Sequence, residues 1–570
     1  MRKSFVRMCL LASALTVGIS ANAQQPRRRP PPPKGTPAPK AQEIELDEPK
    51  PAGGQKVVDN SPPPTAGQMT EQAAQAKRLF DGEKWSEAAL ALYRVYKGET
   101  GDDEGNKQLA QYHLAICLYR LKFYQAAYAY FSEISDKPNH LKFNETLLWL
   151  SKLATDLPEP ADIVERVGKY NDEQIARFNN PNQRDLFWQL NYLLGRYKYR
   201  NRQYEEALTL FGKVDRQSRY YVQAQFFGGI SNVQLRKSVP AVQAFTRIVS
   251  AIDEGVDDET RMRDLAFLSM ARTYYSASIR LDENNAPTID SQKLSAAVKY
   301  WNKVDVASEY WLDALFEESW AYFMAGDYSH ALGNIHTIEA PYFPNSYYPE
   351  AGVLKSVIYF ANCQYDDATG IVAKFQTKYQ PIYNDLSDVL KRFKGDNQEE
   401  SFYKFLKDVR DDKADLKASV KPIVKNALSD RQLLRNLEYV AALDKEAGRF
   451  KAAPQNFQSS TLGGDVKDAL QLARDIAVRN AGQLARDRYQ RNLDELNEHL
   501  RDSAKILIDI TAAQRNQLDQ AIAGSQVSRE ESKANIVKPD EEHVIWPFDG
   551  EYWRDELGFY RQTITSKCGR

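Results

Sequence analysis

A spacing of large and small apolar residues recurs through the first two thirds of the chain. Its clearest copy is Leu114-Ala115-x2-Leu118-x5-Tyr124-x2-Ala127-x3-Phe131-x2-Ile134. Large residues at these offsets fill the groove between two antiparallel helices, and Ala115 and Ala127 let the helix backbones approach closely. The pattern therefore predicts pairs of antiparallel helices.

Six further copies align on the small residue of the second helix. They are Trp85-x2-Ala88-x3-Leu92, Tyr204-x2-Ala207-x3-Phe211, Ala241-x3-Phe245-x2-Ile248, Ala297-x3-Trp301-x2-Val304, Tyr328-x2-Ala331-x3-Ile335 and Tyr365-x2-Ala368-x3-Val372. Ala207 and Ala241 are 34 residues apart, as are Ala297 and Ala331, which is the period of the tetratricopeptide repeat (TPR). We expect an all-α fold in which residues 69–379 form a TPR-like solenoid of helical hairpins.

Two longer intervals interrupt the period. Ala127 and Ala207 are 80 residues apart, which predicts one degenerate pair whose first helix is Phe143–Leu157. Ala241 and Ala297 are 56 residues apart, and the extra length predicts a loop around Asp282–Ser291. A generic helical protein also places Ala and Leu three to four residues apart, and the repeated period argues against that reading.

The chain beyond the repeats divides into further helical parts. Residues 380–464 keep a helical pattern without a clean repeat, and we expect them to cap the solenoid. Residues 465–524 lack proline and predict a long helical, coiled-coil-like arm. Its apolar seams are Leu470, Ala473, Ala477 and Leu484, then, shifted in phase, Leu493, Leu496, Leu500, Leu507 and Ile510. Such an arm either pairs with another chain or folds back against the solenoid.

The C-terminal part, residues 525–570, combines a charged linker with a short aromatic segment. Six aromatic residues fall within residues 546–560, a density that is costly to leave in water. The segment predicts a turn at Pro547 and Gly550 and a short helix over Tyr552–Tyr560. Its aromatic side chains either dock on the protein itself, which we favour, or insert into a partner. The candidate partner-binding residues of this segment are Trp546 and Trp553.

The N-terminus has the pattern of a secretory signal. Arg2, Lys3 and Arg7 precede an uncharged stretch, and the small-x-small sequence Ala21-Asn22-Ala23 follows it. Residues 1–23 therefore predict a cleavable signal peptide, and residues 24–68 a disordered Pro-rich leader. We expect a periplasmic protein, with outer-membrane association as an open alternative. The charge of Arg7 in front of Cys9 argues against a lipoprotein signal.

Charge and cysteine content narrow the classes further. The formal net charge is −1, and cleavage after residue 23 leaves −4, so the chain has no general electrostatic attraction for nucleic acid. Cys117, Cys363 and Cys568 would remain, an odd number without the spacing of a disulfide framework. Cys117 and Cys363 are expected in the core. Cys568 is expected at the surface, where it can form a cross-link.

The sequence carries no pattern of catalytic or metal-binding residues. Its six histidines are scattered, and it lacks an HExxH motif, paired Cys-x2-Cys sequences, a phosphate loop, a dinucleotide fingerprint and a Gly-x-Ser-x-Gly elbow. We therefore expect no catalytic residues, no bound metal and no cofactor, and interpret the chain as a non-enzyme.

The first helix of each TPR pair lines the concave face, and its exposed positions predict a binding surface. Tyr, Trp and Arg dominate interface energetics because they bury a large area and keep polar groups. The candidate partner-binding residues are Tyr119, Arg120, Tyr192, Arg196, Tyr199, Arg200, Arg272, Tyr275, Trp320 and Phe323. The alternative for each ring is packing between repeats. Arg196 and Arg200, one helical turn apart, favour an acidic or C-terminal carboxylate partner.

Together, the signal, the Pro-rich leader, the irregular TPRs, the long helix and the segment Trp546–Tyr560 resemble the periplasmic TPR proteins of the adventurous gliding motility machinery of myxobacteria (AglT type). The resemblance implies a noncatalytic protein–protein interaction scaffold in the bacterial cell envelope. Its partners would be envelope proteins of a motility or assembly complex, with peripheral contact to the outer membrane or cell wall. The alternatives are an outer-membrane assembly or secretion factor and a subunit of a cell-wall-acting enzyme.

Overall fold

The computed structural model describes residues 64–568 except 258, 282–286, 345, 394, 396, 429, 523–538, 542–543 and 546. The expected signal peptide, nearly all of the Pro-rich leader and Trp546 lie outside these residues. The described chain is almost entirely helical, with one small antiparallel strand pair.

The described helices confirm the all-α, TPR-like solenoid. Its antiparallel pairs are α2 (Glu71–Asp81) with α3 (Trp85–Tyr96), α4 (Glu104–Arg120) with α5 (Tyr124–Ser135), α9 (Arg184–Arg200) with α10 (Tyr204–Phe211), α11 (Tyr221–Gln234) with α12 (Ser238–Asp253), α13 (Thr260–Ser278) with α14 (Ser291–Trp301), α15 (Trp311–Ala325) with α16 (Tyr328–Ile338), and α17 (Pro349–Ala361) with α18 (Tyr365–Lys391). The anchors Ala127, Ala207, Ala241, Ala297 and Ala331 are all fully buried, as the close approach of the paired helices requires.

The turn inside most pairs has one conformation. A single residue with left-handed backbone joins the two helices in five pairs: Glu83, Lys122, Arg202, Arg236 and Cys363, with φ between 56° and 64°. The α15–α16 pair uses Gly326 at φ 77° instead. This turn reverses the chain within three residues, which places the turn residue at the tip of the hairpin.

The two long intervals hold irregular structure. In the first, α6 (Thr146–Asp156) lies inside the predicted range, but its partner is broken into the short helices η1 (Glu159–Ala161), α7 (Ile163–Val167) and α8 (Asp172–Ala176). In the second, the hairpin of β1 (Ile279–Leu281) and β2 (Pro287–Ile289) separates α13 from α14.

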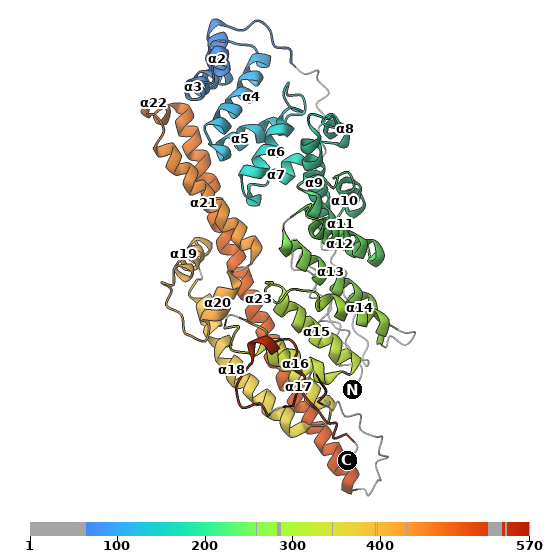
Figure 1. Ribbon diagram of the computed structural model, residues 1–570. Helices are drawn as coiled ribbons and strands as arrows, with labels where there is room; N and C mark the ends of the chain where they lie inside the picture. The colour runs from blue at the N-terminus through green and yellow to red at the C-terminus, as the bar shows by residue number, and fades with distance from the viewer. Residues whose placement is uncertain are drawn as a thin grey trace, which may run out of the picture.

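The remaining helices run back along the solenoid. They are α19 (Gln398–Arg410), α20 (Lys421–Ala427), α21 (Arg431–Lys451), α22 (Gln455–Gln458) and α23 (Thr461–Ile522), while α18 continues through Pro381 past residue 379. Figure 1 shows the repeats as an arc, with α23 crossing from the first repeats to the last and α21 packed beside the first part of α23. At 1.5 Å per residue, α23 is about 90 Å long. Of the two alternatives for the arm, the structure shows the one that folds back.

The two apolar seams of α23 serve two different cores, except that Leu484, the last residue of the first seam, already packs against the second core. Leu470 and Ala477 belong to the core of the first repeats, together with residues of α21. Leu493 and Leu496 belong to the core of the last repeats, together with α18 and α19. A straight helix that serves two cores must shift its apolar face between them, which accounts for the change of phase in the sequence. The middle repeats have a separate core of their own, built from α11, α12 and α13.

Helix α21 is fixed to the first repeats by polar contacts with the start of α5. The buried Glu446 carboxylate accepts backbone N–H bonds from Gln125 at 3.0 Å and Ala126 at 3.4 Å. The Tyr439 hydroxyl donates to the Gln125 side-chain carbonyl at 2.7 Å. The first N–H groups of a helix have no partner within the helix, so α21 supplies the acceptor that this buried helix end requires.

The C-terminal segment docks on the last repeats, as favoured above. Leu557 and Ile564 are buried in their core, and only a 3-10 turn, η2 (Arg554–Glu556), stands where the helix Tyr552–Tyr560 was expected. That prediction was wrong: a turn follows η2 over residues 557–559, and the Gly558 N–H donates to the Thr337 hydroxyl of α16 instead of to a helix of its own.

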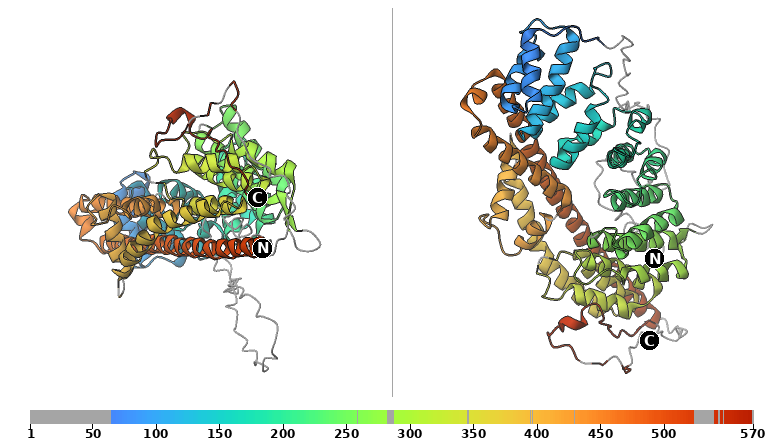
Figure 2. Two further views of the ribbon diagram at one scale, coloured as in Figure 1. Left: turned by 90° about the horizontal axis from the view of Figure 1, so that it is seen from below. Right: turned by 45° about the horizontal axis from the view of Figure 1, so that its top comes forward.

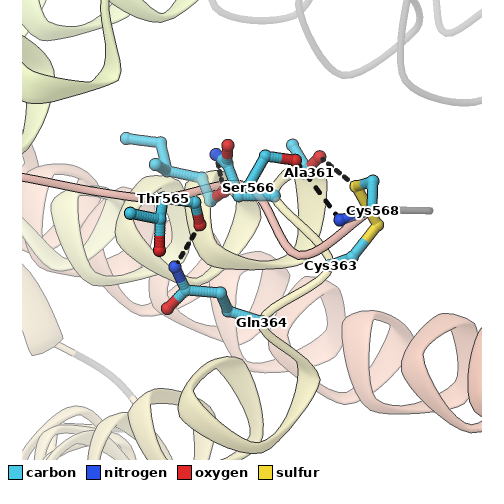
Figure 3. The surroundings of a disulfide bond; sticks show 8 residues. Ala361, Cys363, Gln364, Thr565, Ser566 and Cys568 are labelled. Atoms are coloured by element: carbon cyan, nitrogen blue, oxygen red, sulfur yellow. Dashed lines mark hydrogen bonds between the residues drawn. A yellow bond between two sulfur atoms is a disulfide. The ribbon is translucent and has the colours of Figure 1, made fainter. Parts of the chain in front are cut away.

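Cys363 is not the core residue that the sequence suggested. It forms a disulfide with Cys568, because it is the left-handed turn residue between α17 and α18 and so lies at a hairpin tip (Figure 3). Cys117 is buried, as expected.

The close packing of α19 on α23 gives the first prediction. A Cβ atom at Gly482 would lie 1.9 Å from the Glu399 carbonyl oxygen, whereas one at Gly464 of the same helix would meet nothing within 4 Å. Gly482→Ala should lower the free energy of unfolding by about 1–3 kcal/mol through overpacking, while Gly464→Ala should raise it by up to about 1 kcal/mol. Thermal unfolding followed by circular dichroism measures both, and equal effects would contradict this packing.

The second prediction concerns pH. Burial raises the pKa of Glu446 from 4.5 to about 7, so the folded state binds this proton more tightly than the unfolded state. The resulting stabilisation is complete below about pH 4.5 and is lost as pH rises through 7. Between pH 6 and 8 the native chain should lose about 1 kcal/mol more stability than Glu446→Gln. Urea unfolding at both pH values tests this, and equal losses in the two chains would refute it.

Candidate partner-binding site

A pocket of about 470 Å³ lies where the degenerate pair, α9 and α11 face α21. Its polar lining consists of Thr155, Glu159, Gln189, Arg196, Arg219, Gln223, Arg435 and Glu438. Its aromatic lining is Tyr192 and Tyr220. Most of the lining comes from the solenoid, and Arg435 and Glu438 of the returning helix α21 complete it. We call it the arginine pocket.

Glu159 is the central charged group of the arginine pocket. Its carboxylate forms ion pairs with Arg196, with Arg200 at 2.6 Å and with Arg435 of α21. The Glu159 side chain is 22% exposed and that of Arg196 is 15% exposed, so these charges are partly shielded from water. Arg200 also lies 3.5 Å from Glu165, and Glu438 lines the pocket, so the pocket itself is lined by three arginines and two carboxylates.

Burial and neighbouring guanidinium groups set the electrostatic environment of Arg196. Burial and the positive charges of Arg200 and Arg435 lower the pKa of Arg196 to about 9, which leaves it charged at neutral pH. Its guanidinium also lies 5.2 Å from the centre of the Phe227 ring and 5.8 Å from that of Tyr192, within the range of a cation–π contact. The group is therefore held in place from two sides.

A second arginine of α21 repeats this arrangement one helical turn away. Arg431 pairs at 2.5 Å with Glu309, which precedes α15 and also pairs with Arg261. Arg431 and Arg435 thus hold carboxylates of two repeats that are far apart in sequence. The pairs fix α21 across the concave side of the solenoid.

The mouth of the pocket is basic and aromatic. Arg219 is exposed and donates hydrogen bonds to the hydroxyls of Tyr220 at 2.8 Å and Thr155 at 3.3 Å, not to a carboxylate. Tyr220 stacks on Tyr192 with ring centres 5.1 Å apart. The side-chain carbonyl of Gln223 is buried without a donor among the described residues. These groups offer a guanidinium and a flat ring to an incoming ligand.

Four predicted residues outside this region contact neighbouring helices of the solenoid. Tyr119 donates to Asp156 at 2.5 Å and packs on Trp149, and Tyr275 packs on Trp301. Arg272 forms a two-pronged ion pair with Glu317 at 2.6–3.0 Å. The fourth, Arg120, is exposed and lies over the ring of Trp85.

Of the four predicted residues of α9, some line the pocket and the others contact neighbouring groups of the solenoid. Tyr192 and Arg196 line the arginine pocket. Arg200 does not line it but forms an ion pair with Glu159, which does. Tyr199 packs edge-on against Phe227 of the next repeat. The structure thus brings two of the four to the candidate site.

Trp320 and Phe323 are not surface residues. They are only 4% and 9% exposed and belong to the core that also contains α18, α19 and α23. Helix α15 uses this face for internal packing, so neither ring is available to a partner. Trp553 is 42% exposed, and Trp546 lies outside the described residues.

Several pocket residues carry no local sequence signal. Arg435 and Glu438 come from α21, more than 200 residues after α9, and no spacing rule connects them. Glu159 lies in a broken repeat helix, where the TPR offsets fail. Arg219 and Tyr220 lie in the connection before α11, where the TPR offsets select no residue.

Comparisons with known proteins leave the family open. No family model matches the chain, and no curated protein matches it. Similar solved structures include the apo form of RapI (TM-score 0.28, 11% identity, 71% of this chain and 96% of that one), a Rap protein complexed with competence and sporulation factor (0.24, 12%, 76% and 98%) and BtubC from P. vanneervenii (0.23, 13%, 46% and 87%). At these TM-scores we draw no argument from them.

Two general features of the described residues bear on function. None of their helices is both long and apolar enough to cross a membrane. Within the same residues, no group of three or more His, Cys, Asp or Glu side chains is arranged to hold a metal ion.

The ion pairs of Glu159 give the third prediction. Glu159→Gln leaves three guanidinium groups close together without their shared carboxylate, so it should lower the free energy of unfolding by about 1–2 kcal/mol. Adding Arg435→Gln should recover part of this loss because one repelling charge is removed. The matched control is Glu165→Gln, whose carboxylate lies 3.5 Å from Arg200 at the edge of the cluster, and it should change stability by less than about 0.5 kcal/mol. Urea unfolding measures all three variants, and a neutral Glu159→Gln would contradict the arrangement.

Proposed function

We propose that this protein is a noncatalytic scaffold that holds protein partners on the inner side of its helical solenoid, with the arginine pocket as the anchoring point. The observation that carries the proposal is the meeting of Arg196, Arg219 and Arg435 with the stacked rings of Tyr192 and Tyr220 in one pocket. Arginine and tyrosine contribute most to protein interfaces. Their presence in a concave site built by two separate parts of the chain favours binding.

The ligand chemistry follows from the donors. Guanidinium groups bind carboxylates in a two-pronged geometry, and Arg219 already points its donors at neutral hydroxyls that a carboxylate can replace. A volume of about 470 Å³ suits one or two side chains. The preferred ligand is an acidic side chain or a C-terminal carboxylate next to an aromatic residue that extends the stack of Tyr220.

The returning helices support a rigid site. Helices α21 and α23 join the first and last repeats, so the curvature of the solenoid is set before a partner arrives. A preorganised surface loses little conformational entropy on binding. This favours a structural role in a stable complex.

For location we propose the bacterial cell envelope. The N-terminal sequence has the pattern of a secretory signal, and the disulfide Cys363–Cys568 is typical of an oxidising compartment such as the periplasm. The resemblance to periplasmic TPR proteins of the gliding machinery supports a role in an envelope complex of that kind. Partners would then be envelope proteins with exposed acidic segments.

Site-specific photo-crosslinking in the producing cells tests the fourth prediction. A photo-reactive residue at Tyr220, at the pocket mouth, should capture defined envelope proteins, whereas one at Val239, which is 69% exposed on α12, should not capture the same set. Arg219→Glu should reduce the Tyr220 products by about tenfold because it repels an acidic ligand.

The matched control is Arg216→Glu. Arg216 is exposed in the same connection, pairs with Glu254 and lies outside the pocket, so its reversal should leave the products unchanged. Capture that is equal at positions 220 and 239, or that is insensitive to Arg219→Glu, would count against the arginine pocket as the anchoring point.

A further inference from the structure

Residues 551–568 form a segment that contains the 3-10 turn η2, followed by a turn, and is otherwise irregular chain; we call it the C-terminal strap. It lies along α16 and the end of α17, where Figures 1 and 2 show it in dark red. Its backbone N–H groups donate to the solenoid at three points: Gly558 to the Thr337 hydroxyl at 3.0 Å, Gln562 to the Ser329 carbonyl at 3.1 Å and Lys567 to the Asn362 carbonyl at 2.8 Å. Main-chain bonds of this kind bind an extended peptide largely independently of its side chains.

The surface beneath the strap is shaped for it. A Cβ atom at Gly333 of α16 would lie 1.7 Å from the Tyr560 carbonyl oxygen, so only glycine permits this approach. Leu557 and Ile564 of the strap are buried, at 6% and 3% exposure. We call this surface the strap groove; it consists of Trp311, Ser329, Gly333, Thr337 and Asn362 with Cys363 at its end.

The end of the strap is fixed covalently. Figure 3 shows Cys568 bonded to Cys363, with Gln364 donating to the Thr565 carbonyl at 2.5 Å next to it. All of these anchoring groups belong to α15–α18 and their connections. The residues that form the groove therefore all lie outside the strap.

The chain leading to the strap is long. Between Ile522 and Pro547 there are 24 residues, which span at most about 80 Å when fully extended. A strap from another molecule would meet the same donors, acceptors and cysteine as the chain's own strap, which is the condition for exchange of a terminal element.

We propose that the strap groove also accepts the C-terminal strap of a second copy of this chain, and that Cys568 of one copy and Cys363 of the other then form the disulfide. In dilute solution the chain's own strap has the advantage of a high effective concentration. Exchange is favoured where copies are crowded together, as in an assembly. The strap is then a covalent connector between scaffold copies.

The covalent step needs a disulfide oxidant. Two thiols, on Cys363 and Cys568, lose two electrons and two protons as the S–S bond forms, and a disulfide such as oxidised glutathione takes them up to become two thiols. The reverse exchange with a dithiol separates the copies again.

Two single-cysteine variants test the proposal, as the fifth prediction. The donor, Cys363→Ser in isotopically labelled full-length chain, keeps Cys568; the acceptor, Cys568→Ser in unlabelled chain, keeps Cys363. Neither variant can form the disulfide with its own strap. After incubation of the mixture in a glutathione redox buffer, mass spectrometry should find a labelled Cys568 peptide linked to an unlabelled Cys363 peptide.

A glycine substitution in the acceptor tests whether the linked peptide forms because the strap docks in the groove or because the two chains collide by chance. Gly333→Ala should reduce the linked peptide by about tenfold because its methyl group clashes with the strap carbonyl. Gly370→Ala, in α18 with nothing within 4 Å of the added methyl group, should leave the yield unchanged. Absence of the linked peptide, or a yield that Gly333→Ala does not reduce, would overturn the proposal.

Discussion

The structure depends on one connection: α23 is packed into the core of the first repeats at one end and into the core of the last repeats at the other. A solenoid of helical pairs contacts only its nearest neighbours, so its curvature is otherwise the sum of many small rotations. A helix about 90 Å long that joins both ends removes that freedom. With α21 beside it, it turns an open arc into a closed frame.

The candidate site is a consequence of that frame. Arg435 and Glu438 reach the solenoid only because α21 runs along α23, and Glu446 and Tyr439 fix α21 on the start of α5. Helix α9 and the connection before α11 present Tyr192, Arg196 and Arg219 to this wall. Positive charge concentrated in a partly shielded pocket gives an acidic partner both attraction and orientation.

The sequence predicted the fold well where its signals are local. Alanine spacing identified the helical pairs, and the two seams of α23 indicated a long helix whose apolar face shifts. The candidate site was predicted only in part, because a pocket between α9 and α21 joins residues that no spacing rule relates. Trp320 and Cys363 show the same limit. Trp320 lies in a core to which α23 also contributes, and Cys363 is bonded to the strap. Both α23 and the strap come from the far end of the chain.

The central claim is that α21 and α23 hold the first and last repeats at a fixed distance. Spin labels at the exposed positions Glu87 of α3 and Thr369 of α18 report that distance by double electron–electron resonance. The account predicts one narrow distribution for the native chain, and a broader one when Glu446→Ala and Tyr439→Phe release α21 from α5. A narrow distribution that those substitutions leave unchanged would contradict it.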